Sequence, residues 1–82
     1  MISVLESINL SAKYLSEKGI DSARMNAELL LAEILGCKRL ELYLKFDKPL
    51  SEDEVVKYRI FLSRRSKGEP LQYILGKVEF FG

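Results

Sequence analysis

The chain has 82 residues, of which 48% are hydrophobic and 30% are charged, and its net charge is +1. This length suits one small domain that buries about 60% of the surface its unfolded chain exposes, and the composition excludes a disordered segment. Because no apolar run approaches the roughly 20 residues that span a bilayer, and the N-terminus lacks a basic start and a cleavage site, we expect a cytoplasmic protein with no membrane partner.

The first predicted helix begins near the N-terminus. Ser3 and Glu6 form a capping box, in which the side chain of each residue binds the backbone N–H of the other. Apolar residues then recur at helical spacing until Gly19, a typical helix stop. The pattern predicts a helix over Val4–Glu17.

The second predicted helix has Asp21 as its N-cap and ends at Gly36. It is apolar on two sides, so it should be covered on both and form the core. Arg24 and Glu28 lie four residues apart in the narrow gap between these sides. The spacing favours a structural ion pair within the helix, and contact with a ligand or a partner is the alternative.

A short third helix is expected over Lys38–Lys45. Leu40 and Leu44 are about one helical turn apart in this segment, so both should pack inward. Pro49 then interrupts the helical pattern.

The fourth predicted helix opens with a second capping box, formed by Ser51 and Glu54, and ends at Gly68. Val56 and Ile60 give it a second apolar side. We therefore expect other parts of the protein to cover this helix on both sides as well.

The last part of the chain contains a helical turn and a strand-like run. Pro70 suits the first position of the turn, where its missing N–H is not needed, and Gly76 ends it. The side chains expected to face the bundle are Leu71, Ile74 and Leu75. Residues 78–81 read as a strand whose partner is missing. We therefore predict an all-α bundle of four to five helices over residues 1–76, followed by a cut strand, as the N-terminal domain of a longer protein.

Five basic residues fall in an eleven-residue stretch without an acid, namely Lys57, Arg59, Arg64, Arg65 and Lys67. In one interpretation they complement the helix dipole and solvate the surface. In the other they form a docking patch for an acidic protein surface or an RNA.

No catalytic, metal-binding or cofactor-binding set is visible in the sequence. The chain has no His and only one cysteine, Cys37, which excludes His-based acid–base catalysis and a structural zinc site in these residues. Its glycines are isolated helix stops or termini rather than parts of a phosphate-binding loop. We therefore expect no catalytic residue, metal ligand or cofactor within the chain.

Four residues flank the expected domain boundary: Gln72, Tyr73, Glu79 and Phe80. They should either pack against the missing domain or help to shape its substrate cleft.

Three segments carry a family likeness. They are residues 21–32, residues 64–76 (R-R-S-K-G-E-P-L-Q-Y-I-L-G) and residues 79–82. Together they resemble the N-terminal domain of the HemK/PrmC family, the methyltransferases that modify the glutamine of the Gly-Gly-Gln motif in peptide-chain release factors. The second segment is the most specific of the three. Asn26 departs from the pattern, because an acidic residue is expected there.

The resemblance implies a helical N-terminal domain, a β-hairpin connector that starts within residues 77–82, and a Rossmann-like catalytic domain, absent here, that binds S-adenosylmethionine. The fragment alone should be inactive. Its partners would be release factors and its own catalytic domain, and the near-neutral charge argues against nucleic acid. The residues that would help to dock an acidic release-factor surface are Arg59, Arg64, Arg65 and Lys67. The alternatives are a purely structural domain and a freestanding module that binds protein or nucleic acid.

Overall fold

The computed structural model describes residues 1–76 and shows an all-α fold with five helices in that range. In chain order these are α1 (Val4–Glu17), α2 (Ala23–Leu35), the 3₁₀ helix η1 (Arg39–Leu44), α3 (Glu52–Ser66) and α4 (Leu71–Leu75). The predicted helical bundle and the bounds of its first helix are thus confirmed. The strand predicted over residues 78–81, with Glu79 and Phe80, lies outside the described residues.

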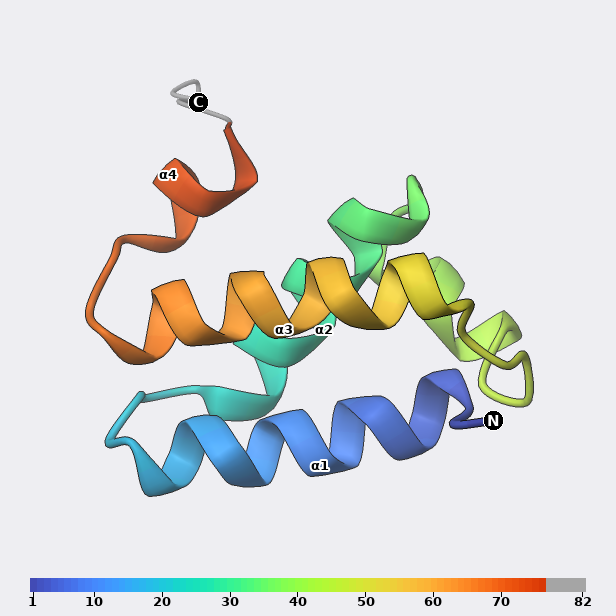
Figure 1. Ribbon diagram of the computed structural model, residues 1–82, viewed down its shortest axis with the longest axis horizontal. Helices are drawn as coiled ribbons and strands as arrows, with labels where there is room; N and C mark the ends of the chain where they lie inside the picture. Colours follow the sequence, from blue (N-terminus) through green and yellow to red (C-terminus); the bar gives the residue numbers. More distant parts are fainter. Residues whose placement is uncertain (77–82) are drawn as a thin grey trace.

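The helices pack around α2. Figure 1 shows α1 and α3 running in the same direction, with α2 behind them and α4 on the opposite side of α3 from α1. α2 contacts all four other helices. It also supplies much of the core, whose buried apolar residues are Val4, Ile8, Leu15, Ala27, Leu30, Leu31, Ala32, Leu42, Leu50, Tyr58 and Ile74. The prediction that the second helix forms the core is confirmed.

The start of α1 is fixed by its cap and by the loop before α3. The capping box at Ser3 and Glu6 is present, with hydrogen bonds of 2.9 and 3.1 Å. The Val4 N–H, which has no partner inside the helix, donates to the carbonyl of Lys48 at 2.9 Å. These bonds hold the N-terminal ends of α1 and α3 close together.

The start of α2 differs from the prediction, because Ser22 and not Asp21 is the N-cap. Ser22 has a φ of +55° and makes no side-chain capping bond. Instead, the amide nitrogen of Asn26 donates to the carbonyls of Asp21 and Ser22, at 3.3 and 3.1 Å. A left-handed turn tied by Asn26 therefore takes the place of an aspartate cap.

The short helix before α3 is a 3₁₀ helix, and the expected inward positions were wrong. Leu42 is fully buried, whereas Leu40 is 76% and Leu44 is 87% exposed. A 3₁₀ helix repeats every three residues rather than every 3.6, so a side chain and the one four positions later do not share a face. The inner face of η1 is thus carried by Leu42.

The predicted capping box of α3, at Ser51 and Glu54, is present. The second apolar side is not covered, since Val56 and Ile60 are each more than half exposed. That part of the prediction was wrong for the described residues, because no helix among them packs on this side of α3.

The turn between α3 and α4 needs a glycine. Gly68 has a φ of +95°, a conformation that side chains rarely adopt. The turn lets the Glu69 N–H reach back to the Arg64 carbonyl at 3.2 Å. Beyond Pro70, α4 directs Leu71, Ile74 and Leu75 toward the core, as predicted.

Candidate docking surface

The basic end of α3 is partly used to hold its own turn. The Arg64 guanidinium binds the Glu69 carboxylate through two nitrogens, one of which, Nε, lies 2.9 Å from Oε1. Hydrogen bonds from Arg64 hold the pKa of the Glu69 carboxyl below its ordinary value. This bidentate pair between guanidinium and carboxylate holds the two sides of the turn together.

Arg65 also points into the molecule. Its Nε donates to Asn26 Oδ1 at 2.8 Å, and its Nη1 donates to the Glu69 carbonyl at 3.2 Å. Asn26 is only 5% exposed. Although an acid is expected at this position from the family pattern, a neutral amide oxygen here accepts the arginine, while the amide nitrogen ties the turn before α2. Arg65 thus joins the end of α3 to the start of α2.

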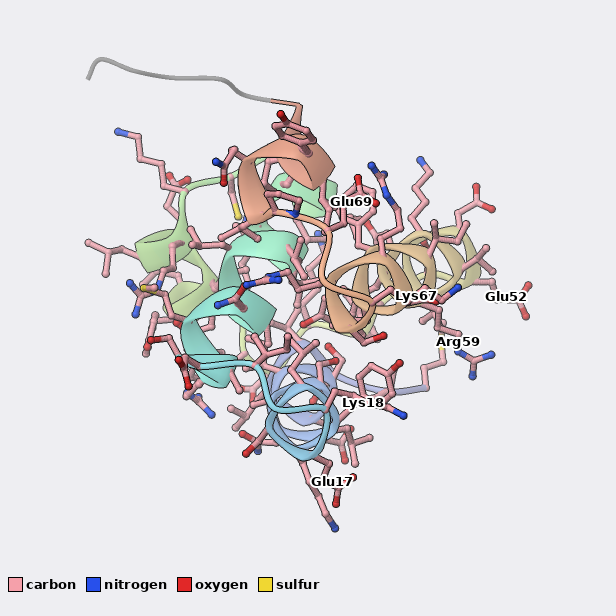
Figure 2. All side chains as sticks on the ribbon, turned by 90° about the vertical axis from the view of Figure 1, so that its left-hand side faces the viewer. Glu17, Lys18, Glu52, Arg59, Lys67 and Glu69 are labelled. Atoms are coloured by element: carbon pink, nitrogen blue, oxygen red, sulfur yellow. The ribbon has the colours of Figure 1, made fainter. Side chains whose placement is uncertain are left out.

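Arg59 and Lys67 remain directed into solvent. Both side chains are exposed, and within the described residues neither makes an ion pair. Figure 2 shows them on the same side of the molecule as Lys18, whose Nζ lies 5.6 Å from the centre of the Tyr14 ring. Three cations from the adjacent helices α1 and α3, and from the residues that end them, therefore border one surface.

This surface contains a groove between α1 and α3. A pocket of about 240 Å³ is lined by residues of both helices and of the segment before α3. A second pocket, of about 380 Å³, shares four of these residues with the first, namely Ile2, Leu50, Val55 and Arg59. The two pockets therefore adjoin, and Arg59 borders both of them.

The two predicted junction residues that the structure describes lie outside the groove. Gln72 and Tyr73 are exposed on α4, with Tyr73 at 64%, and Glu79 and Phe80 are outside the described residues. Since α4 and α1 lie on opposite sides of α3 (Figure 1), Gln72 and Tyr73 on α4 are separate from the groove. The docking and junction roles of all these residues stay predictions.

Glu28 is the centre of a polar cluster that the sequence showed only in part. Its carboxylate is 1% exposed and accepts hydrogen bonds from Arg24 Nε at 3.1 Å, Arg39 Nε at 2.7 Å and the Tyr43 hydroxyl at 3.1 Å. The bond to Glu28 raises the pKa of Arg39. Arg24 also donates to Asn9 Oδ1 at 2.9 Å. A carboxylate that lies between the two apolar sides of a buried helix needs several hydrogen-bond donors. From this requirement alone, partners of Glu28 in addition to Arg24 could have been predicted from the sequence.

The described residues hold neither a metal-binding cluster nor a membrane-spanning helix. Over residues 1–76 no group of three or more His, Cys, Asp or Glu side chains is placed to hold a metal ion. In that same range no helix is long and apolar enough to cross a membrane.

The sequence of this chain is similar to those of a known protein family. Residues 6–76 match the family described as "PrmC N-terminal domain". Proteins named "Release factor glutamine methyltransferase" from Geobacter sulfurreducens and Chlorobaculum tepidum are 52% and 41% identical, over 84% and 98% of this chain and 24% and 27% of their own lengths. The Bacillus subtilis protein of that name is 33% identical over 100% of this chain and 28% of its own length.

The chain thus spans about a quarter of the length of these relatives. No solved structure was found to match it. With a match over residues 6–76 and relatives well above 30% identity, the chain belongs to the PrmC N-terminal domain family.

Proposed function

We propose that this chain is the N-terminal domain of an S-adenosylmethionine-dependent methyltransferase that modifies the glutamine of the Gly-Gly-Gln motif in peptide-chain release factors. Within that enzyme, the domain helps to seat the release factor. The observation that carries this proposal is the match over residues 6–76 together with the shared name of the relatives. The role would place the protein in the cytoplasm, where translation ends.

A docking domain would supply binding energy that the reacting glutamine itself cannot provide. A single glutamine on a flexible loop provides little binding energy, so contacts far from the reacting amide must supply affinity and position. The exposed cations Arg59 and Lys67, and the groove that Arg59 borders, suit a large protein substrate with an acidic surface, because opposite charges speed encounter. Exposed Gln72 and Tyr73 are available for contact with a further domain.

The residues that the structure describes, 1–76, do not fit the methyl donor. Gly19, Gly36, Gly68 and Gly76 each sit at the end of a helix with a positive φ, and they are far apart in sequence. None of them belongs to a glycine-rich loop that leads into a helix N-terminus, where dinucleotide-like cofactors bind. We assign the donor and the chemistry to the portion of the relatives that this chain does not cover, and we expect the fragment alone to be inactive.

The test compares two substrates of the whole enzyme. The full-length methyltransferase and a version without residues 1–76 are assayed on intact release factor and on a short peptide that contains the Gly-Gly-Gln loop. Binding of S-adenosylmethionine and the thermal unfolding curve of the shortened enzyme show whether its catalytic part is still folded.

Docking predicts that kcat/KM falls for the intact release factor and stays nearly constant for the peptide. An equal fall on both substrates, with the shortened enzyme still folded, would instead support a domain that only stabilises the catalytic part.

A further inference from the structure

The basic residues of α3 divide into two groups. Arg64 and Arg65 are held by Glu69 and Asn26 and close the turn at the end of the helix. Arg59 and Lys67 have no such partners among the described residues. Cations that are not engaged within the domain are the ones available to an acidic partner.

One of these two cations, Arg59, borders an apolar groove, and Lys67 follows Arg59 at the end of the same helix. The walls of the groove include Ile2, Leu50, Val55 and Leu62. Leu10 of α1 and Val56 of α3 also line it and are 61% and 55% exposed. Exposed apolar side chains beside a hollow are typical of a surface that binds another protein.

The polar groups in the floor of the groove already have hydrogen-bond partners, so an apolar side chain can cover them. The Ser7 hydroxyl donates to the Val4 carbonyl at 3.0 Å, and the Tyr58 hydroxyl donates to the Ala27 carbonyl at 2.7 Å. No buried side-chain nitrogen or oxygen of the described residues lacks a hydrogen-bond partner. Covering the groove would therefore leave these polar groups satisfied.

The groove has two different ends. At one end the groove is lined by Leu62, and beyond that residue the Tyr14 hydroxyl donates to Ser66 Oγ at 3.0 Å and joins α1 to α3. At the other, Glu52 borders the second pocket. From Glu52 to Leu62, the first and last residues of α3 that line the pockets, the helix rises by about 15 Å at 1.5 Å per residue, which matches about three turns of a bound helix.

We infer that the groove between α1 and α3 binds an amphipathic segment of the release factor, with its apolar side chains against Leu10, Val55 and Val56 and its carboxylates against Arg59 and Lys67. The carboxylates meet α3 from Arg59 onward, on the C-terminal side of Glu52. This inference rests on the proposed function and specifies the surface that performs it. Apolar anchors spaced along one face of a helix are the usual way in which such a groove is filled.

The first test blocks the groove in the full-length methyltransferase. Leu10→Glu combined with Val56→Glu places carboxylates where apolar side chains should enter. The matched control is Leu40→Glu combined with Leu44→Glu, which changes two exposed leucines of η1 instead. The groove variant should raise KM for intact release factor by about 10-fold, the size of a lost interface anchor, whereas the control should change it less than about 2-fold. Neither pair should alter kcat/KM for the loop peptide.

The second test reverses the two cations. Arg59→Glu combined with Lys67→Glu should lower kcat/KM for intact release factor about 10-fold at low salt, and the effect should shrink at high salt because screening removes electrostatic steering. Lys13→Glu combined with Lys57→Glu is the control. It changes the net charge equally, and both lysines are exposed and line neither pocket. Equal losses in the two variants would mean that net charge alone matters, and would overturn the assigned surface.

Cross-linking separates failure of the groove from failure of docking. A photoreactive phenylalanine analogue is placed at Leu10 or at Tyr73 of the full-length enzyme, and intact release factor is added. Cross-links from Leu10 to an acidic amphipathic segment support the inference. Cross-links from Tyr73 alone, with normal kinetics for the groove variants, would overturn the groove and leave docking by this domain intact. Cross-links from neither position, with equal losses on both substrates after removal of residues 1–76, would overturn both.

Discussion

Removal of the Glu28 carboxylate should be among the most damaging single changes in the described part of the domain. Glu28 is 1% exposed and accepts from Arg24, Arg39 and Tyr43. Breaking a fully buried ion pair costs about 3–5 kcal/mol. Here the side chains of the two arginines are 47% and 41% exposed, so water can solvate them once the carboxylate is gone. We therefore expect Glu28→Ala to lower the free energy of unfolding by about 2 kcal/mol.

A loss of this size is readily measured in a small domain. It corresponds to a fall of about 8–16 °C in Tm, followed by far-UV circular dichroism during heating and in urea. Glu28→Gln keeps the shape of the side chain and one acceptor oxygen, so it should lower the free energy of unfolding by about half as much as Glu28→Ala. The amides of η1 should exchange faster in both variants, because Arg39 and Tyr43 hold η1 to α2 through this carboxylate.

Glu17→Ala is the matched control, since Glu17 is exposed near the end of α1 (Figure 2). It should change stability by less than about 0.5 kcal/mol. If Glu28→Ala behaved like Glu17→Ala, with unchanged exchange in η1, the cluster would add nothing to stability and the reasoning above would be refuted.

Three further outcomes are expected. Ser51→Ala removes the cap of α3 and should cost about 1 kcal/mol in urea unfolding; no change would mean that water replaces the cap. Tyr58→Phe removes the bond to the Ala27 carbonyl, and a loss of about 1 kcal/mol in the same assay is expected, so an unchanged midpoint would contradict it. The pKa of Glu69 is lowered by Arg64 from its ordinary 4.5, so the pair should stabilise the domain above pH 4.5 and lose this effect as the pH falls through the lowered pKa. Glu69→Gln should flatten the acid limb of stability against pH, and an unaltered limb would exclude this pair as its cause.

The features that the sequence predicted correctly are short-range. The capping boxes at Ser3 and Ser51 depend on a residue three positions later, and the extent of α1 follows from one such box and one glycine. The wrong predictions have different causes, and the cap of α2, at Ser22 instead of Asp21, shows that short-range signals can also mislead. Leu40 and Leu44 were predicted to face inward because α-helical spacing was assumed for a segment that is a 3₁₀ helix. The face of α3 that carries Val56 was predicted to be covered because it is apolar, but no described residue covers it.

The internal contacts that the sequence did not reveal join distant parts of the chain. Arg65 and Asn26 are 39 positions apart, and Tyr43 reaches Glu28 from a different helix. Neither helical periodicity nor charge spacing reveals such pairs, because both describe one helix at a time. The sequence could show that arginines cluster at the end of α3, and only the fold shows which of them face solvent.

That division changes how a docking experiment on this domain should be interpreted. Arg64 and Arg65 look like the strongest candidates in the sequence, yet each holds the turn between α3 and α4. Replacing them would loosen the turn and displace α4, so methylation would fall even if release factor never touched either side chain. The side chains of Arg59 and Lys67 make no such internal contact within the described residues, so their replacement removes no side-chain bond of the turn. A loss of activity in the Arg59 and Lys67 variant, with an unchanged Tm, therefore reports on docking in a way that the neighbouring arginines cannot.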